Sequence, residues 1–468
     1  MRKILFLLFL ILSGTGYIFA QNASVINGVW QRTKTGDIKL FGVDNGSLHQ
    51  LAVSPVGENE TFGFNFVPPK EGYYVIGLSS SILANRYIFY FKPGDKLNLK
   101  VLENSYELTG ENTPENKEMA RWHDFVFPLE DKSIYYVGKN SIYTDFFPLF
   151  EEKLKELKNY APSSTPNKKF NTSFENFKKY DLLTIALMFV QTPRSKHPQT
   201  EDYIDYYKHL NLPKLTKNAD ILNYPQGMDI LMHAYMVTIK IDDKLTEDQK
   251  QEKYLDPVSY LLGGSDSNVL ANDTLKGEVA VMMARANRSP ASFNEYKNKY
   301  VKYVITANQK DRWKEVEAAL KKNVERNNAI NFKFADANGK EIALSDLKGK
   351  VVYIDVWATW CGPCRKEIPF LKKLEAEYAG NKDMVFMGIN VDVSRDRQKW
   401  LDFLQTEQLP GIQVFAGATA KTALMDPYKI TGIPRFILVG KDGKLIFADA
   451  PRPSSNEIRA ILNSALKE

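Results

Sequence analysis

The sequence is poor in the residues that hold metal ions or form several disulfides. It has two cysteines and five histidines in 468 residues. The histidines are His49, His123, His197, His209 and His233, so none follows the cysteine pair. A tetrahedral zinc site needs four ligands, and the two cysteines cannot supply them alone. We therefore expect neither a metal ion nor another cofactor, and a cysteine-rich disulfide framework is excluded.

Long apolar runs are also scarce. The first twenty residues have Arg2 and Lys3, an apolar run from Ile4 to Leu12, and small residues up to Ala20. This order is typical of a secretory signal peptide, and the run is too short to span a bilayer comfortably. We expect cleavage after Ala20. The alternative is an uncleaved anchor, which would be the only membrane contact of the chain.

Charge of one sign is not concentrated in any segment. The net charge of +6 comes from 62 basic and 56 acidic residues that are dispersed along the chain. Such a pattern indicates a solvated surface, so we expect no nucleic-acid partner. At about 150 residues per domain, the length predicts a multidomain protein.

Three segments differ in their patterns. Residues 21–110 have short runs rich in Val, Ile, Phe and Tyr between Asn-Gly, Pro-Pro and Pro-Gly turns, which predicts an N-terminal β-sandwich. Residues 111–328 have apolar residues at three- and four-residue spacing, which predicts a middle α-helical domain. Residues 329–468 alternate between the two patterns, which predicts an α/β domain with a mixed sheet.

The C-terminal segment contains recognisable local units. A hairpin is expected to turn at residues 337–340, and a second one at Asp442 and Gly443. "KVVYIDVWA" and "DMVFMGINVD" are expected buried strands, each followed by a helix. Ser454 and Glu457 have the spacing of a capping box, so we expect them at the start of the last helix.

Cys361 and Cys364 are spaced for disulfide exchange, since a loop closed over two intervening residues adds little stability. Exchange needs one thiolate that attacks and a second thiol that resolves the mixed disulfide. Cys361 lies where the strand passes into the helix, and a helix N-terminus lowers the pKa of a thiol. We therefore predict that Cys361 is the nucleophile and that Cys364, more buried, is the resolving thiol. Pro363 costs little at this position because helix N-termini leave N–H groups unpaired.

Asp355 lies in the apolar strand before the cysteines, six residues before Cys361. A carboxyl group among apolar side chains has a raised pKa, which suits a general base for the proton of Cys364. The alternative is an outward-facing aspartate on an edge strand.

The stretch "DVWATWCGPCRKEIP" resembles the active-site segment of the thioredoxin superfamily, and within it the exported TlpA/ResA-like thiol-disulfide oxidoreductases. "YKITGIPRFILVGKDGKLI" is similar to the family segment that carries a cis-proline, here Pro434. The resemblance implies a thioredoxin fold for residues 329–468, with Pro434 facing the cysteines and the backbone of Ile433 pairing with substrate. Other predicted substrate contacts are Trp360, Gly362 and Pro363. Arg435 departs from the family's usual Thr, and either favours acidic substrates or is a solvated charge.

The resemblance also implies a function. We expect a periplasmic or envelope protein that reduces disulfides of exported proteins, with electrons from a membrane thiol donor of the DsbD/CcdA type. Cytochrome c biogenesis is one possible use. Residues 21–110 and the start of the helical segment are similar to the accessory region of Bacteroidetes-type envelope proteins, which implies no activity. The alternatives are a disulfide oxidase or isomerase, a peroxiredoxin, and a non-enzymatic peptide- or carbohydrate-binding protein with a vestigial thioredoxin domain.

Overall fold

The computed structural model describes residues 22–34, 36–161, 165–263, 269–287, 290–322, 328–430, 432–455 and 457–468. The chain forms two compact units, residues 1–279 and 280–468, and the boundary between them falls within helix α9 (Asp273–Ala284). The predicted signal peptide lies outside the described residues. The three predicted domain boundaries remain predictions.

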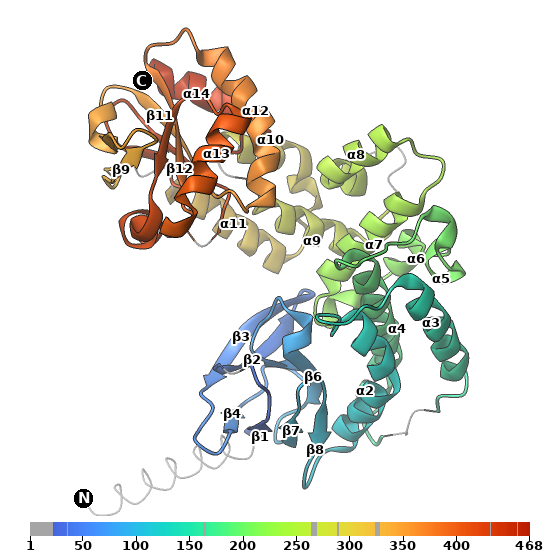
Figure 1. Cartoon of the computed structure of the whole chain (residues 1–468). Coiled ribbons are helices and arrows are strands. Elements are labelled where there is room, and N and C mark those ends of the chain that lie inside the picture. Colours follow the sequence, from blue (N-terminus) through green and yellow to red (C-terminus); the bar gives the residue numbers. More distant parts are fainter. Residues whose placement is uncertain are drawn as a thin grey trace, which may run out of the picture. The chain divides into compact units, whose positions relative to one another are not determined.

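The N-terminal unit begins with a strand-rich region, as predicted (Figure 1). Its strands are β1 (Ser24–Trp30), β2 (Ile38–Asp44), β3 (Ser47–Ser54), β4 (Thr61–Phe66), β5 (Gly72–Gly77), β6 (Arg86–Phe91), β7 (Lys96–Val101) and β8 (Tyr106–Leu108). They form two four-stranded sheets with the orders β4-β1-β7-β8 and β3-β2-β5-β6. The predicted Asn-Gly turn joins β2 to β3, and both Asn45 and Gly46 adopt positive φ, as such a turn requires.

The two sheets contribute to one hydrophobic core. Ile26 and Leu99 come from one sheet and Leu40, Ile76 and Phe89 from the other, and each is at most 1% exposed. The aromatic residues of β5 and β6 are mostly buried in the same way. These aromatic side chains therefore serve mainly to pack the interior.

Helices follow the strands, and the predicted helical middle region is confirmed. They are α2 (Pro114–Ser133), α3 (Tyr143–Leu157), α4 (Lys168–Gln191), α5 (Asp205–Lys208), α6 (Leu212–Leu215), α7 (Gly227–Ile241) and α8 (Glu247–Leu255). The buried side chain of Asn116 on α2 exchanges two hydrogen bonds of 2.9 Å with the backbone of Tyr90 on the edge strand β6. It takes the place of a neighbouring strand and so attaches α2 to the sheet.

The C-terminal unit places a mixed sheet among helices, as the α/β pattern predicts. After α10 (Pro290–Tyr300) and α11 (Ala307–Lys322) its elements are β9 (Lys333–Asp336), β10 (Glu341–Ala343), β11 (Val351–Trp357), α12 (Gly362–Tyr378), β12 (Met384–Asn390), α13 (Arg397–Glu407), β13 (Ile412–Phe415), β14 (Arg435–Val439), β15 (Leu445–Phe447) and α14 (Ile458–Lys467). The strand order is β10-β9-β13-β12-β11-β14-β15. The neighbours of β11 are β12, which is parallel to it, and β14, which is antiparallel.

Strand β11 is buried along its whole length, and its side chains alternate between two cores. Val352 and Ile354 belong to the core on one face of the sheet. Val351 and Tyr353 belong to the core on the other face, together with Leu371 and other residues of α12 and α14. The strand thus positions whatever follows it at the centre of the unit.

Two local expectations differ from the structure. Ser454 and Glu457 do not form a capping box, because α14 begins at Ile458 and its N-cap residue is Glu457, whose side chain does not cap the helix. Ser454 is hydrogen-bonded elsewhere, to Glu367. Strand β13 was not expected, because its four residues are too few to show a strand pattern in the sequence.

The segment that leads into β9, residues 328–330, is hydrogen-bonded to the turn between β14 and β15 and to Tyr428. The N–H of Ala329 donates to the carbonyl of Gly443 at 3.0 Å, in the turn between β14 and β15. Asn328 forms an isolated bridge with Lys444, and the hydroxyl of Tyr428 donates to the carbonyl of Ile330 at 2.7 Å. These contacts fix the entry to the sheet.

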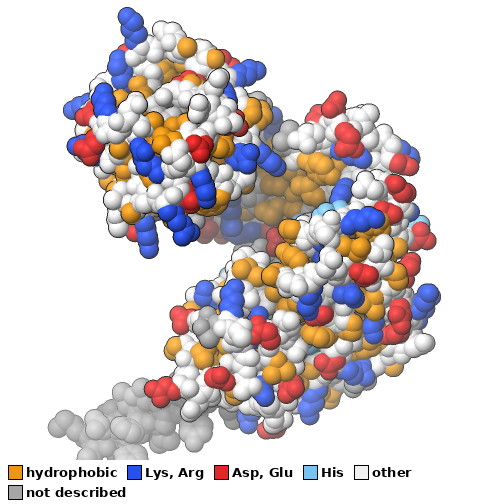
Figure 2. Space-filling view, viewed as in Figure 1, with side chains coloured by type: hydrophobic (Ala, Val, Ile, Leu, Met, Phe, Trp, Pro, Cys, Tyr) orange, Lys and Arg blue, Asp and Glu red, His pale blue; other side chains and the backbone are white. Residues whose placement is uncertain are grey.

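The surface of each unit carries mixed charge. Figure 2 shows basic and acidic side chains interspersed over the visible face of each. Among the described residues, no helix is both long and apolar enough to cross a bilayer.

Candidate functional site

The two cysteines form a disulfide at the start of helix α12. Cys361 is the N-cap residue, and its Sγ accepts a hydrogen bond of 3.2 Å from the N–H of Cys364. Pro363 occupies the first turn, where its missing N–H breaks no helical bond. The sulfur of Cys361 therefore lies at the positive end of a helix of 17 residues.

Both cysteines are buried, whereas the residues next to Cys361 are exposed. Cys361 is 3% exposed and Cys364 is 2% exposed, so in the disulfide form burial does not distinguish the two predicted roles. Gly362 and Pro363 are exposed, and Trp360 is 71% exposed. This rim, residues 360–363, offers an apolar surface beside the disulfide.

Asp355 is buried in β11 and lies on the same face of the sheet as Tyr353, because alternate residues of a strand share a face. The residue is 7% exposed, and Oδ1 has no hydrogen-bond partner among the described residues. Burial, with a smaller effect from the charge of Glu367, raises the pKa of this carboxyl to about 8. The expectation of a buried aspartate in a central strand is thus met, and its role as a base remains a prediction.

Glu367 is a residue of this site that sequence reasoning missed. It lies on α12, is 7% exposed, and its two carboxylate oxygens accept hydrogen bonds from the hydroxyl and the N–H of Ser454 at 2.9 and 3.1 Å. Arg452 Nη1 lies 3.8 Å from Oε1. The negative charge of Glu367 contributes to the raised pKa of Asp355. Its position one turn after Cys364 placed it near the cysteines, but nothing in the sequence marked it as buried.

Asp392 was also missed, and it holds the loop before the cysteines. It is fully buried, and its Oδ2 accepts hydrogen bonds from the N–H of Thr359 at 3.1 Å and from Nδ2 of Asn390 at 3.0 Å. The N–H of Asp392 donates in turn to Oδ1 of Asn390 at 3.0 Å. This pair therefore fixes the backbone that presents Trp360.

The Ile433–Pro434 peptide bond is cis, as expected. Ile433 packs against the hydrophobic cluster that contains Cys361 and Cys364, so the segment before β14 lies beside the disulfide. Arg435 follows, and its Nη1 lies 3.5 Å from Oδ2 of Asp449 and donates to the carbonyl of Ala448 at 3.4 Å. Its charge is partly balanced within the unit, which favours a structural role over the binding of acidic substrates.

The arrangement suits thiol-disulfide exchange. It combines a sulfur at a helix N-terminus, a second sulfur one turn later, a buried carboxyl group with a raised pKa, and an exposed aromatic rim. Among the described residues, no group of three or more His, Cys, Asp or Glu side chains is arranged to hold a metal ion.

Comparison with known proteins identifies the same region. Residues 324–462 match the sequence model of the Redoxin family. The ResA thiol-disulfide oxidoreductase of a Bacillus cereus strain is 34% identical over 119 residues, and that of Bacillus subtilis is 31% identical over 122 residues. These matches cover 25% and 26% of this chain and 65% of each relative. The chain thus spans just under two thirds of the length of these relatives.

Solved structures are similar to part of the chain. A Bacteroides vulgatus protein assigned to the thiol-disulfide oxidoreductases is 40% identical, and the match covers 30% of this chain and 94% of that one with a TM-score of 0.27. The thioredoxin domain of a second Bacteroides vulgatus oxidoreductase is 27% identical, covering 29% of this chain and 96% of that one with a TM-score of 0.27.

Proposed function

Since residues 324–462 of this chain belong to the Redoxin family, with ResA-like thiol-disulfide oxidoreductases among their relatives, we propose that the protein reduces disulfides of other exported proteins. The observation that supports this proposal most directly is the Cys361–Cys364 disulfide at the N-terminus of α12. A helix N-terminus favours a thiolate, and the thiolate is the species that attacks a disulfide.

The reaction begins with the dithiol form. The thiolate of Cys361 attacks one sulfur of the substrate disulfide, and the other substrate sulfur leaves as a thiolate that takes a proton from water. The thiol of Cys364 then loses its proton and attacks the sulfur of Cys361. The bond between Cys361 and the substrate breaks, and the second substrate sulfur leaves as a thiolate. The substrate has gained two electrons, and the protein now holds the disulfide.

Asp355 is the proposed acceptor for the proton of Cys364. A carboxyl group with a pKa of about 8 is partly ionised near neutral pH and basic enough to take a proton from a thiol. Glu367 acts through Asp355 as a positioning residue, because its charge raises the pKa of the aspartate. Trp360, Gly362, Pro363 and Ile433 would contact the substrate chain.

The electrons must come from outside the protein, because each turnover leaves the cysteines oxidised. We propose a membrane thiol donor of the DsbD/CcdA type and a location in the periplasm or cell envelope, with cytochrome c maturation among the uses. The signal-peptide pattern of the first 20 residues supports the location. Residues 21–110 would form a β-sandwich, a description supported by the shared core of the two sheets.

Trapping of substrate tests the proposal. In envelope extracts, Cys364→Ser should accumulate mixed disulfides through Cys361, because the resolving thiol is missing. Cys361→Ser and the double variant should trap none. If Cys364→Ser traps no protein and the wild-type chain does not reduce a disulfide in the presence of a dithiol, the proposed function is wrong.

The direction of exchange needs a separate measurement. Equilibration with glutathione gives the reduction potential of the cysteine pair. A value near about −270 mV indicates a reductant, whereas a value near about −120 mV indicates an oxidase.

A further inference from the structure

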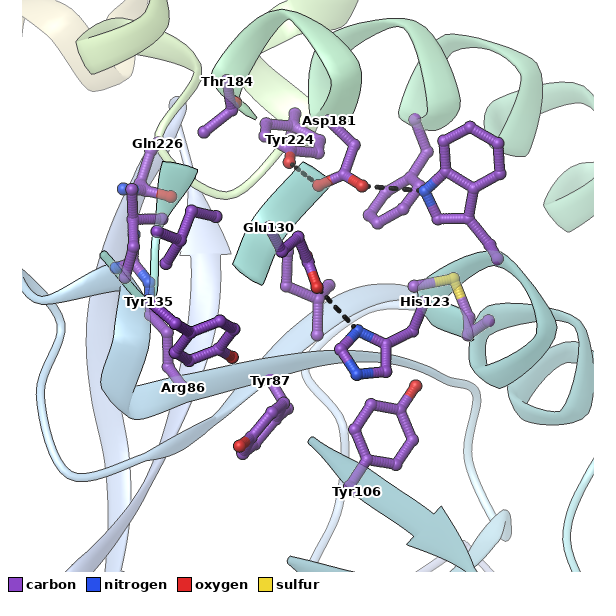
Figure 3. A pocket seen from close by; sticks show the side chains of 16 residues that line it. Arg86, Tyr87, Tyr106, His123, Glu130, Tyr135, Asp181, Thr184, Tyr224 and Gln226 are labelled. Carbon is purple, nitrogen blue, oxygen red and sulfur yellow. Dashed lines mark hydrogen bonds and ion pairs between the residues drawn. The ribbon is translucent and has the colours of Figure 1, made fainter. Parts of the chain in front are cut away.

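A second candidate site lies in the N-terminal unit, away in sequence from the cysteines. It is a cavity of about 60 Å³ between strand β6, helices α2 and α4, and the turn that leads into α7 (Figure 3). Leu83, Thr184 and Gln226 also line an adjoining cavity of about 100 Å³. Since each water of the liquid takes about 30 Å³, the first cavity has room for about two waters or one molecule of similar volume.

Arg86 is the first sign that this cavity is built for a ligand. It begins β6, is 5% exposed, and lines the cavity wall. Its Nη1 donates to the carbonyl of Ser80, but its buried Nη2 has no hydrogen-bond partner among the described residues. Burial lowers the pKa of Arg86 to about 10, and Tyr224 and Asp229 only partly offset this. A buried guanidinium is costly unless its donors are used.

Arg194 shows how the same unit satisfies an arginine with a structural role. It is less buried than Arg86, yet Nε, Nη1 and Nη2 all donate, to the carbonyls of Phe189, Ser141 and Ser133 at 3.0, 3.0 and 3.2 Å. The guanidinium also lies over the ring of Phe189, 3.9 Å from its centroid. The contrast indicates that Nη2 of Arg86 is available to donate a hydrogen bond to a ligand.

Gln226 is the second sign. It adopts φ 70° and ψ 25° at the N-cap of α7, a conformation that is uncommon for residues other than glycine, and its side chain does not cap the helix. Its amide Oε1 is buried and has no hydrogen-bond partner among the described residues. Strained backbone of this kind persists where the surroundings require it, often at binding sites. The oxygen is an acceptor for a donor group of a ligand.

His123 adds a polar group on the opposite wall. Figure 3 shows Arg86 and Gln226 on one side of the cavity and His123 and Tyr106 on the other. Nδ1 of His123 lies 3.0 Å from Oε2 of Glu130, and its buried Nε2 has no partner among the described residues. Burial lowers the pKa of His123, but the carboxylate of Glu130 outweighs it and the net shift is upward. The imidazole thus presents a second N–H to the cavity when it is protonated.

We propose that this cavity binds a small organic carboxylate that carries a hydroxyl or amino group beside the carboxylate. The carboxylate accepts hydrogen bonds from Arg86, which matches the preference of guanidinium for planar oxyanions. The neighbouring donor group binds Oε1 of Gln226. The adjoining cavities of about 60 and 100 Å³, which meet at Gln226, together limit the ligand to roughly the size of glycolate.

Titration of the full chain with sodium glycolate tests this, at constant ionic strength, by calorimetry and thermal shift. A ligand of about five non-hydrogen atoms should bind saturably with a Kd on the order of 1 mM. Glycolamide has the same shape without the charge, and acetate lacks the donor group. We expect glycolamide not to bind and acetate to bind several-fold more weakly. Equal responses to glycolate and glycolamide, or no saturable response, would overturn the proposal.

Two variants locate the site. Arg86→Met should weaken glycolate binding by about tenfold or more, since charge-assisted hydrogen bonds are the strong ones. Arg194→Met is the matched control, and it should lower the melting temperature without changing the affinity. Gln226→Asn retracts the amide by one carbon while keeping a residue that tolerates positive φ, and should weaken glycolate more than acetate. If Arg86→Met does not fold, Gln226→Asn and the preference of the wild type for glycolate decide the question.

Discussion

The carboxylate of Glu367 on α12 is held by Ser454, which donates to it both from its hydroxyl and from its backbone N–H. The two residues are 87 positions apart in the sequence. The contact connects α12 to the segment before α14, and it keeps a negative charge close enough to raise the pKa of Asp355. A contact between residues far apart in the chain thus influences the pKa of a buried carboxyl in β11.

Replacing Glu367 by Gln should change the pH dependence of the resolving step. The substitution keeps the shape of the side chain and removes the charge, so the pKa of Asp355 should fall. Since the base acts in its ionised form, the rate of attack by Cys364 should reach its plateau at a lower pH. Single-turnover release of substrate from the mixed disulfide, followed across pH, measures this. Glu377→Gln, an exposed position on the same helix, is the control and should leave the profile unchanged.

Replacing Asp355 by Asn should make the fold less sensitive to pH. The pKa of Asp355 rises from 3.8 in the reference state to about 8 in the fold, so the native state binds the proton more tightly. Its contribution to stability is present at acid pH and is lost as pH rises toward 8. Relative to Asp355→Asn, the oxidised wild-type protein should lose stability on the order of several kcal/mol between pH 4 and pH 8, as about 1.4 kcal/mol accompanies each unit.

Urea unfolding at a series of pH values measures that difference. The exposed carboxylate of Asp402 on α13 provides the control. The stability of Asp402→Asn should depend on pH as that of the wild type does. Parallel curves for the wild type and Asp355→Asn would contradict the raised pKa.

Replacing Asp392 by Ala should loosen the loop before the cysteines. The change removes the acceptor for the N–H of Thr359 and leaves that group unpaired, which should cost about 1 to 3 kcal/mol. Hydrogen exchange at the Thr359 amide should accelerate by about tenfold or more, since exchange reports local opening. Asp426→Ala, at a site of the same unit outside this loop, should leave this amide unaffected. Unchanged protection in Asp392→Ala would show that other contacts hold the loop.

Replacing Trp360 by Ala should separate substrate docking from chemistry. The ring is 71% exposed, so its loss should change the free energy of unfolding by less than about 0.5 kcal/mol. Exposed aromatic side chains contribute strongly to protein interfaces, so kcat/KM for a protein disulfide should fall by about tenfold. The rate with a small disulfide should be nearly unchanged. Val137→Ala, an exposed apolar position of the other unit, is the control for both substrates.

The sequence predicted best the features that depend on local chemistry. Asn45-Gly46 and Asp442-Gly443 make the turns that were expected, because positive φ is demanded within the turn itself. Asp355 was expected to be buried because its neighbours in the strand are apolar, and it is 7% exposed. The spacing of the cysteines likewise places both sulfur atoms in one turn of helix.

Features that depend on tertiary contacts were missed. A glutamate on an amphipathic helix is usually solvated, so nothing local marked Glu367 as buried against Ser454. The same contact removed Ser454 from its expected cap of α14. Strand β13 has only four residues, and it forms because β12 and β9 offer unpaired edges. The groups of the cavity around Arg86 come from strands and helices far apart in the sequence, and periodicity cannot bring them together.

The contacts of residues 328–330 with the turn after β14 and with Tyr428 matter for how this unit can be cut from the chain. A fragment that started at Lys333 would keep every strand of the sheet but lose the bonds made by Ala329 and Ile330. The hairpin of β9 and β10 would then be held to the rest of the sheet mainly by its short pairing with β13. Proteolytic cleavage just before β9 should therefore release the edge strands β9 and β10 first. Helix α12 packs against the interior strand β11 and should stay folded longer.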